Sequence, residues 1–350
     1  MKEGAHLELK DKIKRLTNAM GVSGDEYEVS NIAAELLAPY VDSVEVDPFG
    51  NVIGYKSCGI PGAPKLLLDA HIDQIGFLVT QVTDEGFLRF MGMGVDQRML
   101  PGSELVIKTR KGQKLLGIVA ATPPHLLKPS DFEKSIPIED MVVDTGMTGE
   151  QAKKVFNIGD YMTFWGDTFD LMGDALCGKA MDDRACFACI LHAMELLQDK
   201  PLAVDLIVVG STKEEVGLDG GRDVAWRTAP DCAIAIDVCH GKTNDSAHQV
   251  ENEMAKGPVI TIGANSLPAM ARKAMELARA KEIPYQVSAA GAATGTNAWF
   301  MQITGEGVAT LVISLPLKYM HSPVEVLRMS DVENVGKLVA EYAAALKGGC

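Results

Sequence analysis

The stretch 202-LAVDLIVVGSTKEEVGLDGG-221 joins a run of apolar residues to a polar segment that contains two adjacent glutamates. The run 202-LAVDLIVVG-210 is short, apolar and rich in β-branched residues, which is typical of a strand buried on both faces. Glu214 and Glu215 follow where the chain leaves this strand. Neighbouring carboxylates repel each other, and an unpaired buried carboxylate costs several kcal/mol. We therefore expect a positive group in front of them.

Helical and strand patterns alternate along most of the chain around this stretch. Such alternation predicts an α/β fold, with a mainly parallel mixed sheet sandwiched by helices. The expected elements are two helices within 8–40, a hairpin at 44–55, strands at 65–70, 203–210, 231–238 and 307–315, and helices at 183–198, 267–282 and 330–346.

Residues 75–165 have a different character. Short β-like pieces such as 76-GFLVTQV-82 and 104-ELVIKT-109 alternate there with turns rich in glycine and proline. This pattern predicts a small β-barrel or sandwich inserted into the α/β fold. We therefore expect one domain formed by residues 1–74 and 166–350, interrupted by a β domain over 75–165.

The composition is that of an ordinary globular protein, with 47% hydrophobic and 23% charged residues among 350. The net charge of −14 argues against nucleic acid and anionic membranes as partners, because both favour a basic face. The N-terminal segment lacks the apolar core of a signal peptide, and no apolar run approaches the ~20 residues that cross a bilayer. Seven scattered cysteines fit buried free thiols better than a disulfide framework. We expect a cytoplasmic protein.

Histidines and carboxylates gather at the ends of the predicted strands. In an open α/β sheet, ligands bind at the carboxyl ends of the strands. One further acidic pair, Asp182–Asp183, stands at the predicted start of a helix in 178-GKAMDDR-184. The residues at or just beyond strand ends are His71, Asp73, Glu214, Glu215, Asp237 and His321. Their convergence on one rim predicts that the positive partner is a metal.

These side chains indicate which metals can bind and what roles the carboxylates can have. Mixed imidazole and carboxylate ligands suit zinc first, with cobalt or manganese as alternatives. One histidine with two or three carboxylates would serve one ion, whereas two histidines with four carboxylates suffice for two ions ~3.5–4 Å apart. Asp73 lies two residues after His71, on the same side of an extended chain, where it can accept the other imidazole N–H. Of Glu214 and Glu215, one can bind metal while the other takes a proton from an activated water.

Each of these features also has a structural interpretation. An acidic pair at a helix start can simply favour the helix dipole. The pair Cys186–Cys189 has no second pair of ligands, so packing is favoured over zinc binding or redox chemistry. The remaining histidines are interpreted as structural or surface residues, and His240, three residues past Asp237, is the main decoy. They are His6, His125, His192, His240 and His248.

The motifs resemble those of the glutamyl/deblocking aminopeptidases, the TET-type dinuclear metallo-aminopeptidases that are sometimes named cellulase or endoglucanase M. The resemblance covers essentially the whole chain. It is carried by 70-AHIDQIGF-77, 178-GKAMDDR-184, 213-KEEVGLDGG-221, 234-IAIDV-238, 294-TGTNA-298 and 319-YMHSPVE-325.

The resemblance implies a set of ligands for two metal ions. Asp182 would bridge the two ions. One ion would also bind Glu215 and His321, and the other His71 and Asp237.

The resemblance also implies an activity and an assembly. Glu214 would be the general base and Asp73 would orient His71, so that the N-terminal peptide bond of a small peptide is hydrolysed. The family has a catalytic domain interrupted by a small β domain, and it assembles through dimers into a hollow dodecamer. The β domain over 75–165 is expected to serve this assembly.

Two positions depart from the family pattern. Gln74 stands where the family has Glu after His-x-Asp, and Asn297 stands where the family has Asp in Gly-Thr-Asp-Ala. Neither belongs to the implied ligands. Both are expected to line the substrate site, and each change removes a negative charge. We hypothesise that recognition of the substrate's ammonium group, or of a basic side chain, is altered.

Three alternative functions stay open. A glycoside hydrolase needs two carboxyl groups ~5–9.5 Å apart across a sugar and no metal, and three tryptophans provide few platforms for sugars. A related two-metal deacylase or carboxypeptidase would differ in the groups that contact the substrate termini. An inactive scaffold subunit is the third alternative. The sequence leaves open the preferred N-terminal residue, the metal used in the cell, and the choice between dimer and dodecamer.

Overall fold

The computed structural model describes residues 7–126, 134–244, 246 and 252–349. The chain divides into two compact units. The larger unit contains Met1–Gln74, Asp167–Met320 and Val324–Cys350, and the smaller unit contains Ile75–Gly166 with His321–Pro323.

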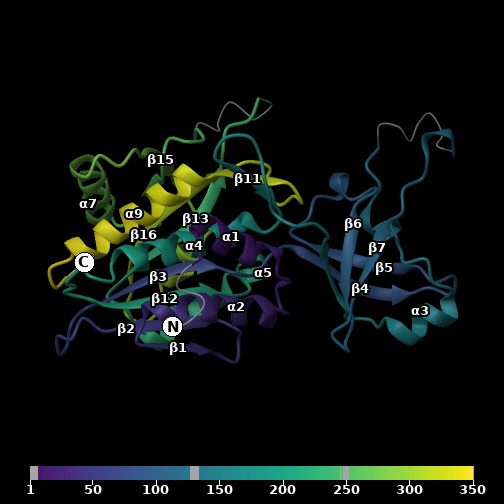
Figure 1. Ribbon diagram of the computed structural model, residues 1–350, viewed down its shortest axis with the longest axis horizontal. Helices are drawn as coiled ribbons and strands as arrows, with labels where there is room; N and C mark the ends of the chain where they lie inside the picture. The colour runs from purple at the N-terminus through teal and green to yellow at the C-terminus, as the bar shows by residue number, and fades with distance from the viewer. Residues whose placement is uncertain (1–6, 127–133, 245, 247–251, 350) are drawn as a thin grey trace. The chain divides into compact units, whose positions relative to one another are not determined.

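The larger unit is built on an eight-stranded mixed sheet in the order β1-β2-β12-β3-β13-β16-β14-β15 (Figure 1). The four central strands β12, β3, β13 and β16 run parallel, and β1, β2 and β14 add antiparallel pairings toward the edges. The predicted α/β fold with a mainly parallel mixed sheet is therefore confirmed. The strands are β1 Ser43–Val46, β2 Val52–Lys56, β3 Lys65–His71, β12 Asp205–Ser211, β13 Cys232–His240, β14 Val259–Gly263, β15 Gln286–Ala290 and β16 Ala309–Leu317.

Helices cover both faces of this sheet (Figure 1). Side chains of β3 alternate between two cores: Leu66 and Leu68 pack with helices α1, α2, α4, α7 and α9, whereas Leu67 packs with α6 and α8. This burial on both faces explains the apolar run Leu66–Leu68 in β3. The helices are α1 Leu9–Asn18, α2 Tyr27–Leu37, α4 Met181–Leu196, α5 Glu214–Gly217, α6 Asp219–Thr228, α7 Pro268–Ala280, α8 Ala298–Met301 and α9 Met329–Ala345.

A three-stranded antiparallel sheet completes the larger unit. It has the order β10-β11-β17, with β10 Phe169–Asp170, β11 Ala175–Gly178 and β17 Glu325–Arg328. Strand β11 leads directly into α4, and its neighbour β17 follows the segment that contains His321. This small sheet therefore positions the start of α4.

The smaller unit is a closed barrel in the order β4-β5-β8-β7-β6-β9. Its core centres on Phe77, whose ring makes edge-to-face contacts with Phe90 and Phe164 at centroid distances of 5.5 and 5.4 Å. The expected β-barrel is therefore present. Its strands are β4 Gly76–Val82, β5 Leu88–Met93, β6 Glu104–Lys108, β7 Lys114–Val119, β8 Val143–Asp144 and β9 Tyr161–Phe164, and its helix is α3 Gly149–Val155.

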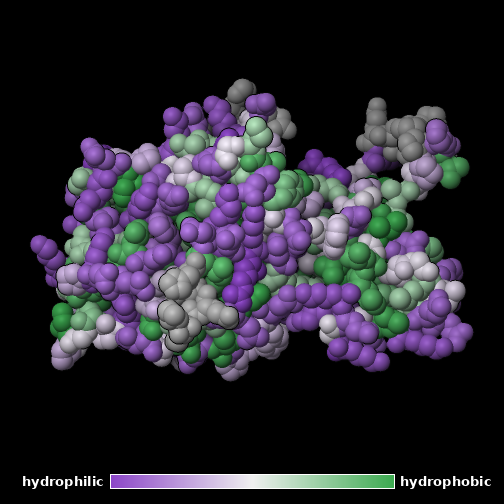
Figure 2. Space-filling view, in the orientation of Figure 1, coloured by the Kyte–Doolittle hydropathy of each residue, from purple (hydrophilic) through white to green (hydrophobic). Residues whose placement is uncertain are grey.

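The surface and the cysteines complete the description. On the face shown in Figure 2, hydrophilic residues cover most of the larger unit. Among the described residues, no helix combines the length and the apolar character needed to cross a membrane. The sequence favoured buried free thiols over a disulfide framework, and Cys232 departs from that expectation because it is disulfide-bonded. Among the residues that the structure describes, the free cysteines are Cys58, Cys177, Cys186, Cys189 and Cys239.

Candidate metal centre

The site lies where the central parallel strands of the larger unit end. His71 is the last residue of β3 and stands opposite Ser211, the last residue of β12. Asp237 lies on β13, the other neighbour of β3. Parallel strands bring their carboxyl ends to one edge, which is the usual binding edge of an open α/β sheet. The start of α4 adds Asp182–Asp183 to the same edge.

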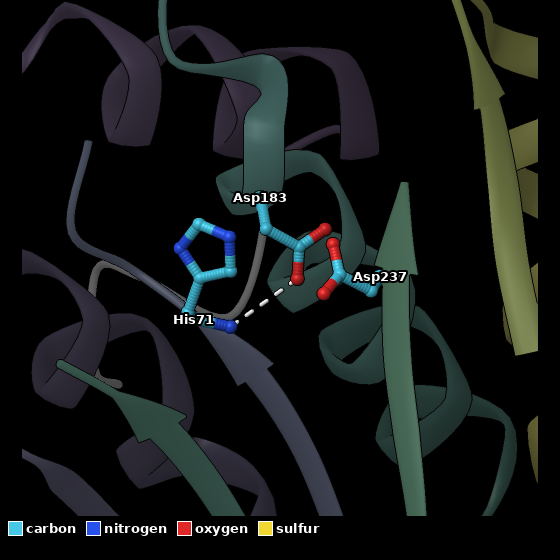
Figure 3. Close-up of side chains that lie close together, drawn as sticks. All are labelled: His71, Asp183 and Asp237. Atoms are coloured by element: carbon cyan, nitrogen blue, oxygen red, sulfur yellow. Dashed lines mark hydrogen bonds between the residues drawn. The ribbon is translucent and has the colours of Figure 1, made fainter. Parts of the chain in front are cut away.

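Two clusters of ligand-type atoms share His71. The first contains His71, Asp183 and Asp237, and the second contains His71, Asp182 and Glu215. Within each cluster the ligand atoms lie within 4.8 Å of one another. Figure 3 shows the carboxylates of Asp183 and Asp237 next to each other, with the backbone N–H of His71 donating to Asp183 Oδ2 at 3.2 Å. Imidazole and carboxylate donors at this spacing fit a divalent metal such as zinc, manganese or cobalt.

His71 is held between acidic side chains. Its Nε2 lies 3.1 Å from Asp182 Oδ1 and 3.7 Å from Glu214 Oε2, and its Nδ1 lies 3.4 Å from Asp73 Oδ1. Burial alone would lower the pKa of His71, but the charges of Glu214, Asp182 and Asp73 outweigh it and raise the pKa well above its usual value. The imidazole thus stands in a strongly negative environment.

Asp73 links the histidine to the two glutamates. Its buried carboxylate accepts hydrogen bonds from Ser23 Oγ at 2.6 Å and from the backbone N–H groups of Glu214 and Glu215 at 3.1 and 3.3 Å. Burial would raise the pKa of Asp73, but the hydrogen bonds and the charge of His71 lower it below its usual value. The two glutamates begin α5 because Lys213, in a left-handed conformation, turns the chain directly after β12. Asp73 therefore fixes both the start of α5 and one side of the imidazole.

The other carboxylates at this edge repel one another in a buried setting. Burial, followed by the balance of neighbouring charges, raises the pKa of Glu214 to about 8. The pKa values of Asp183, Glu215 and Asp237 are raised well above the usual range, first by burial and then by neighbouring carboxylates. A divalent cation among these groups would favour their ionised forms. The donor set, in which several carboxyl groups surround one imidazole, therefore fits a metal centre.

A buried arginine fixes the backbone that carries His71 and Asp73. Arg184 follows the acidic pair in α4, and its guanidinium donates to the carbonyls of Ile72, Leu16, Ala19 and Gly21 at 2.7–3.1 Å. Burial lowers the pKa of Arg184 to about 10. The bond to Ile72 fixes the residue between His71 and Asp73, so Arg184 holds the chain that carries both.

The structure brings together most of the residues predicted from the sequence: His71, Asp73, Asp182, Glu214, Glu215 and Asp237. Asp183 was noted in the sequence only as the neighbour of Asp182, yet it accepts from the His71 backbone. His321 falls with the smaller unit, so its role as a ligand stays a prediction.

Gln74 and Asn297 are both buried, each with 2% of its surface exposed. Asn297 Nδ2 donates to Asp69 Oδ2 at 2.8 Å and to Ser211 Oγ at 2.9 Å. Burial raises the pKa of Asp69 to about 6, although the hydrogen bonds of Asp69 with Asn297 and Ser211 oppose the shift. Gln74 Nε2 has no hydrogen-bond partner among the described residues. The role of both side chains in substrate binding stays a prediction.

The remaining described histidines belong to neither cluster, whereas Cys186 of the cysteine pair forms a hydrogen bond with Asp183. Within the described part of the chain, His71 is the one histidine in either cluster. His240 ends β13 in an exposed position, and His192 lies within α4. Cys186 and Cys189 are buried free thiols. His6 and His248 lie outside the described residues.

Comparisons with known proteins agree on one family. The family model described as M42 glutamyl aminopeptidase matches residues 50–338. The lysyl aminopeptidase of Pyrococcus furiosus is 34% identical over 340 residues, which cover 96% of both chains. The solved TET aminopeptidase of a marine sediment Thaumarchaeota archaeon has a TM-score of 0.90 and 30% identity, covering 97% of both chains.

A third relative is named for its assembly. The Pyrococcus horikoshii TET1 peptidase, described as able to assemble into a tetrahedron or a large octahedral shell, has a TM-score of 0.82 and 31% identity. The match covers 97% of this chain and 100% of that one. The family model covers residues 50–338, and these relatives of 30–34% identity cover 96–97% of the chain. The chain therefore belongs to the M42 glutamyl aminopeptidase family.

Proposed function

We propose that the protein is a metal-dependent aminopeptidase that removes N-terminal residues from peptides with the help of two divalent ions. The observation that carries this proposal is the number of carboxylates gathered around His71, with Asp183 and Asp237 in one cluster and Asp182 and Glu215 in the other. These carboxylates offer more oxygen ligands than one cation beside an imidazole needs, which favours two neighbouring cations.

The ligand roles follow from the contacts of each carboxylate. Asp182 lies in one cluster with His71 and Glu215, which we assign to different ions, so Asp182 would be the ligand that both ions share. His71 and Asp237 would complete one position, and Glu215 with His321 the other. Asp183 accepts from the backbone of His71, so we assign it to holding the end of β3.

Bound divalent ions would supply Lewis-acid chemistry, since they favour ionisation of a water molecule near neutral pH and polarise the substrate carbonyl. Zinc is the first choice for these donors, with cobalt or manganese as alternatives.

Glu214 is the proposed general base. It belongs to neither cluster among the described residues, yet its Oε2 lies 3.7 Å from His71 Nε2. Its backbone N–H is anchored by Asp73, which limits the movement of the side chain. A carboxylate held beside the ligands can accept a proton from the attacking water and return it to the leaving amine. Asp73 orients His71 and does not itself contact the substrate in this scheme.

Small peptides are the proposed substrates and a homo-oligomer, as a dimer or a dodecamer, is the proposed state. Relatives named lysyl and glutamyl aminopeptidase support the first part, and the assembling TET1 peptidase supports the second. The barrel also exposes Leu116, Ile118 and Trp165 around a surface pocket of about 270 Å³. Exposed apolar patches of this kind commonly mark protein–protein contacts. The cytoplasmic location stays a prediction from the sequence.

The acidic groups of this site differ from those of a glycoside hydrolase. Their oxygens converge with an imidazole within 4.8 Å, whereas a glycosidase separates two carboxyl groups by ~5–9.5 Å across the sugar. A deacylase or carboxypeptidase with the same metals would differ in the substrate termini that it accepts, so peptide ends provide the test.

The test is hydrolysis of matched free and N-acetylated peptides by the purified protein. The assay is run before and after chelation, and after Zn²⁺, Co²⁺ or Mn²⁺ is added back. We expect cleavage of free N-termini alone, loss on chelation and recovery with metal. Cleavage of acetylated peptides or of C-terminal residues would favour the deacylase or carboxypeptidase alternative. No cleavage with any metal would contradict an enzymatic role and favour the inactive subunit.

A further inference from the structure

The start of α4 lies in irregular backbone although it carries the proposed shared ligand. Ala180 has a left-handed conformation with a φ of 54°, and Asp182 and Asp183 both have non-helical φ and ψ values. The first N–H groups of a helix have no acceptor within the helix. Ala180 stands at the capping position and has no side-chain oxygen to offer. The local sequence therefore cannot fix this segment by itself.

Glu325 supplies an acceptor from another strand. It is the first residue of β17 and pairs with Gly178 of β11. Its side chain is only 1% exposed, and Oε2 accepts hydrogen bonds from the N–H groups of Met181 at 2.7 Å and Asp182 at 3.2 Å. Hydrogen bonds to an ionised acceptor are stronger than neutral ones, so one carboxylate can hold both N–H groups firmly.

We propose that Glu325 is a positioning residue that fixes Asp182 as a metal ligand, an inference that rests on the proposed function. The hydrogen bond to the Asp182 N–H holds the backbone from which the Asp182 carboxylate extends. That carboxylate lies 3.1 Å from His71 Nε2. The backbone N–H of Asp182 and its side chain are attached to the same Cα. A rotation of this backbone would therefore move the carboxylate away from His71.

The charge of Glu325 acts in the same direction. Glu325 Oε2 lies within hydrogen-bond distance of the Asp182 backbone N–H, which places the carboxylate next to the proposed shared ligand. Glu325 therefore adds to the negative potential around the proposed ligands, and such a potential favours the binding of divalent cations.

Asp331 offers a matched comparison in the same unit. Its carboxylate is fully buried and accepts the backbone N–H groups of Ala255 and Gly257 at 2.7 Å each. Neither Ala255 nor Gly257 belongs to the ligand clusters. If Glu325 only stabilised the fold, Glu325→Gln and Asp331→Asn would have the same consequences.

The experiment compares the wild type, Glu325→Gln and Asp331→Asn after metal removal by chelation. Co²⁺ affinity is measured by titration against a competing chelator, and the coordination of bound Co²⁺ by its visible absorption spectrum. Thermal unfolding of the metal-free proteins reports the structural loss. We expect Glu325→Gln to weaken Co²⁺ binding about 10–100-fold, the usual effect of losing a group that holds a ligand in place, and to change the spectrum. Asp331→Asn should lower thermal stability and leave both Co²⁺ readouts unchanged.

Equal Co²⁺ affinity in all three proteins, or an equal loss in both variants, would overturn the positioning role and leave the proposed function intact. A wild type that binds no divalent ion would overturn the proposed function, and this inference with it. If Glu325→Gln does not fold, Glu325→Asp takes its place, because it keeps the charge but withdraws the acceptor by one methylene. Wild-type Co²⁺ affinity in Glu325→Asp would then reject the proposal.

Discussion

Ser23 Oγ lies 2.6 Å from Asp73 Oδ2 and donates a hydrogen bond to it. Both residues are buried, and the same carboxylate accepts the N–H groups of Glu214 and Glu215. The polar turn before α2 is thus connected to the proposed general base through one carboxylate.

Replacement of Ser23 by alanine is expected to lower kcat/KM about 10–100-fold, since it removes a partner of a group that orients the site. The measurement is steady-state hydrolysis of a free peptide at saturating metal. Ser30→Ala is the matched control: Ser30 is also buried, but its hydroxyl donates to the carbonyls of Gly50 and Glu26. Equal activities of the two variants would argue against a catalytic role for the Ser23–Asp73 bond.

Glu214→Gln is expected to lose ~10²–10⁴-fold in kcat, the usual contribution of a general acid–base group. The number of metal ions bound should stay at the wild-type value, because Glu214 is not a proposed ligand. Elemental analysis of the purified variant provides that second readout. A variant with wild-type kcat would refute the assignment of the base.

Chelation is expected to lower the melting temperature of the wild type. A ligand that binds only the native state raises the free energy of unfolding, by about 2.7 kcal/mol at a concentration 100-fold above Kd, and chelation removes this contribution. Asp237→Asn should show a smaller shift, because one proposed ligand has lost its charge. Differential scanning calorimetry with and without chelator measures both shifts. The same shift in both proteins would exclude Asp237 from the ligand set.

Asn297→Asp is expected to destabilise the protein, because the new carboxylate would face Asp69, whose Oδ2 lies 2.8 Å from Asn297 Nδ2. Two buried carboxylates at this distance cannot both ionise without a large cost. The double variant Asp69→Asn/Asn297→Asp restores one amide and one acid and should recover most of the lost stability. Chemical denaturation measures the free energy of unfolding of the wild type, both single variants and the double variant. If the losses of the two single variants simply add in the double variant, the pairing of residues 69 and 297 is contradicted.

The same variant tests the substrate hypothesis. If Asn297 alters recognition of the substrate's ammonium group or of a basic side chain, Asn297→Asp should change the ranking of kcat/KM across a panel of peptides. An unchanged ranking would leave the amide a structural role at the strand ends.

Stability near neutral pH should depend on Glu26. Burial raises the pKa of Glu26 to about 7 from its ordinary 4.5. Because the folded pKa lies above the unfolded one, the neutral carboxyl favours folding, and this contribution is lost as pH rises through about 7. Glu26→Gln keeps an acceptor for the Gly24 N–H but does not titrate. The variant's melting temperature relative to wild type should therefore increase from pH 4.5 to pH 8, and a constant difference would contradict the shift.

The sequence predicted the central sheet because its strands are buried on both faces. Continuous apolar runs at 65–70 and 203–210 have few other interpretations. Strands β14 and β15 were not predicted. They are five residues each, and their 259-VITIG-263 and 286-QVSAA-290 segments are partly exposed. Their place in the sheet depends on β16, which lies far along the chain, and no local pattern records that pairing.

The parts of the site that could be predicted are those whose residue types, histidine and carboxylate, are typical of metal ligands. Histidines and carboxylates at strand ends indicated the proposed metal ligands, and six of the predicted site residues lie together in the structure. Supporting residues were harder to find, because Ser23, Arg184 and Glu325 act through contacts with backbone or with side chains distant in the sequence. Glu325 contacts the start of α4 from 144 residues away. Ordinary polar residues of this kind acquire a role only once the fold brings them together.

The four carbonyls that accept from Arg184 limit how far the N-terminus of the protein can be truncated. Those of Leu16, Ala19 and Gly21 lie before residue 50, where the family match begins. A product trimmed to the matched residues would leave guanidinium N–H groups without partners in a dry interior, which is costly for a charged donor. Truncated or fused variants should therefore keep the N-terminal helices intact. Through Arg184, the backbone of these helices is connected to the segment that carries His71 and Asp73.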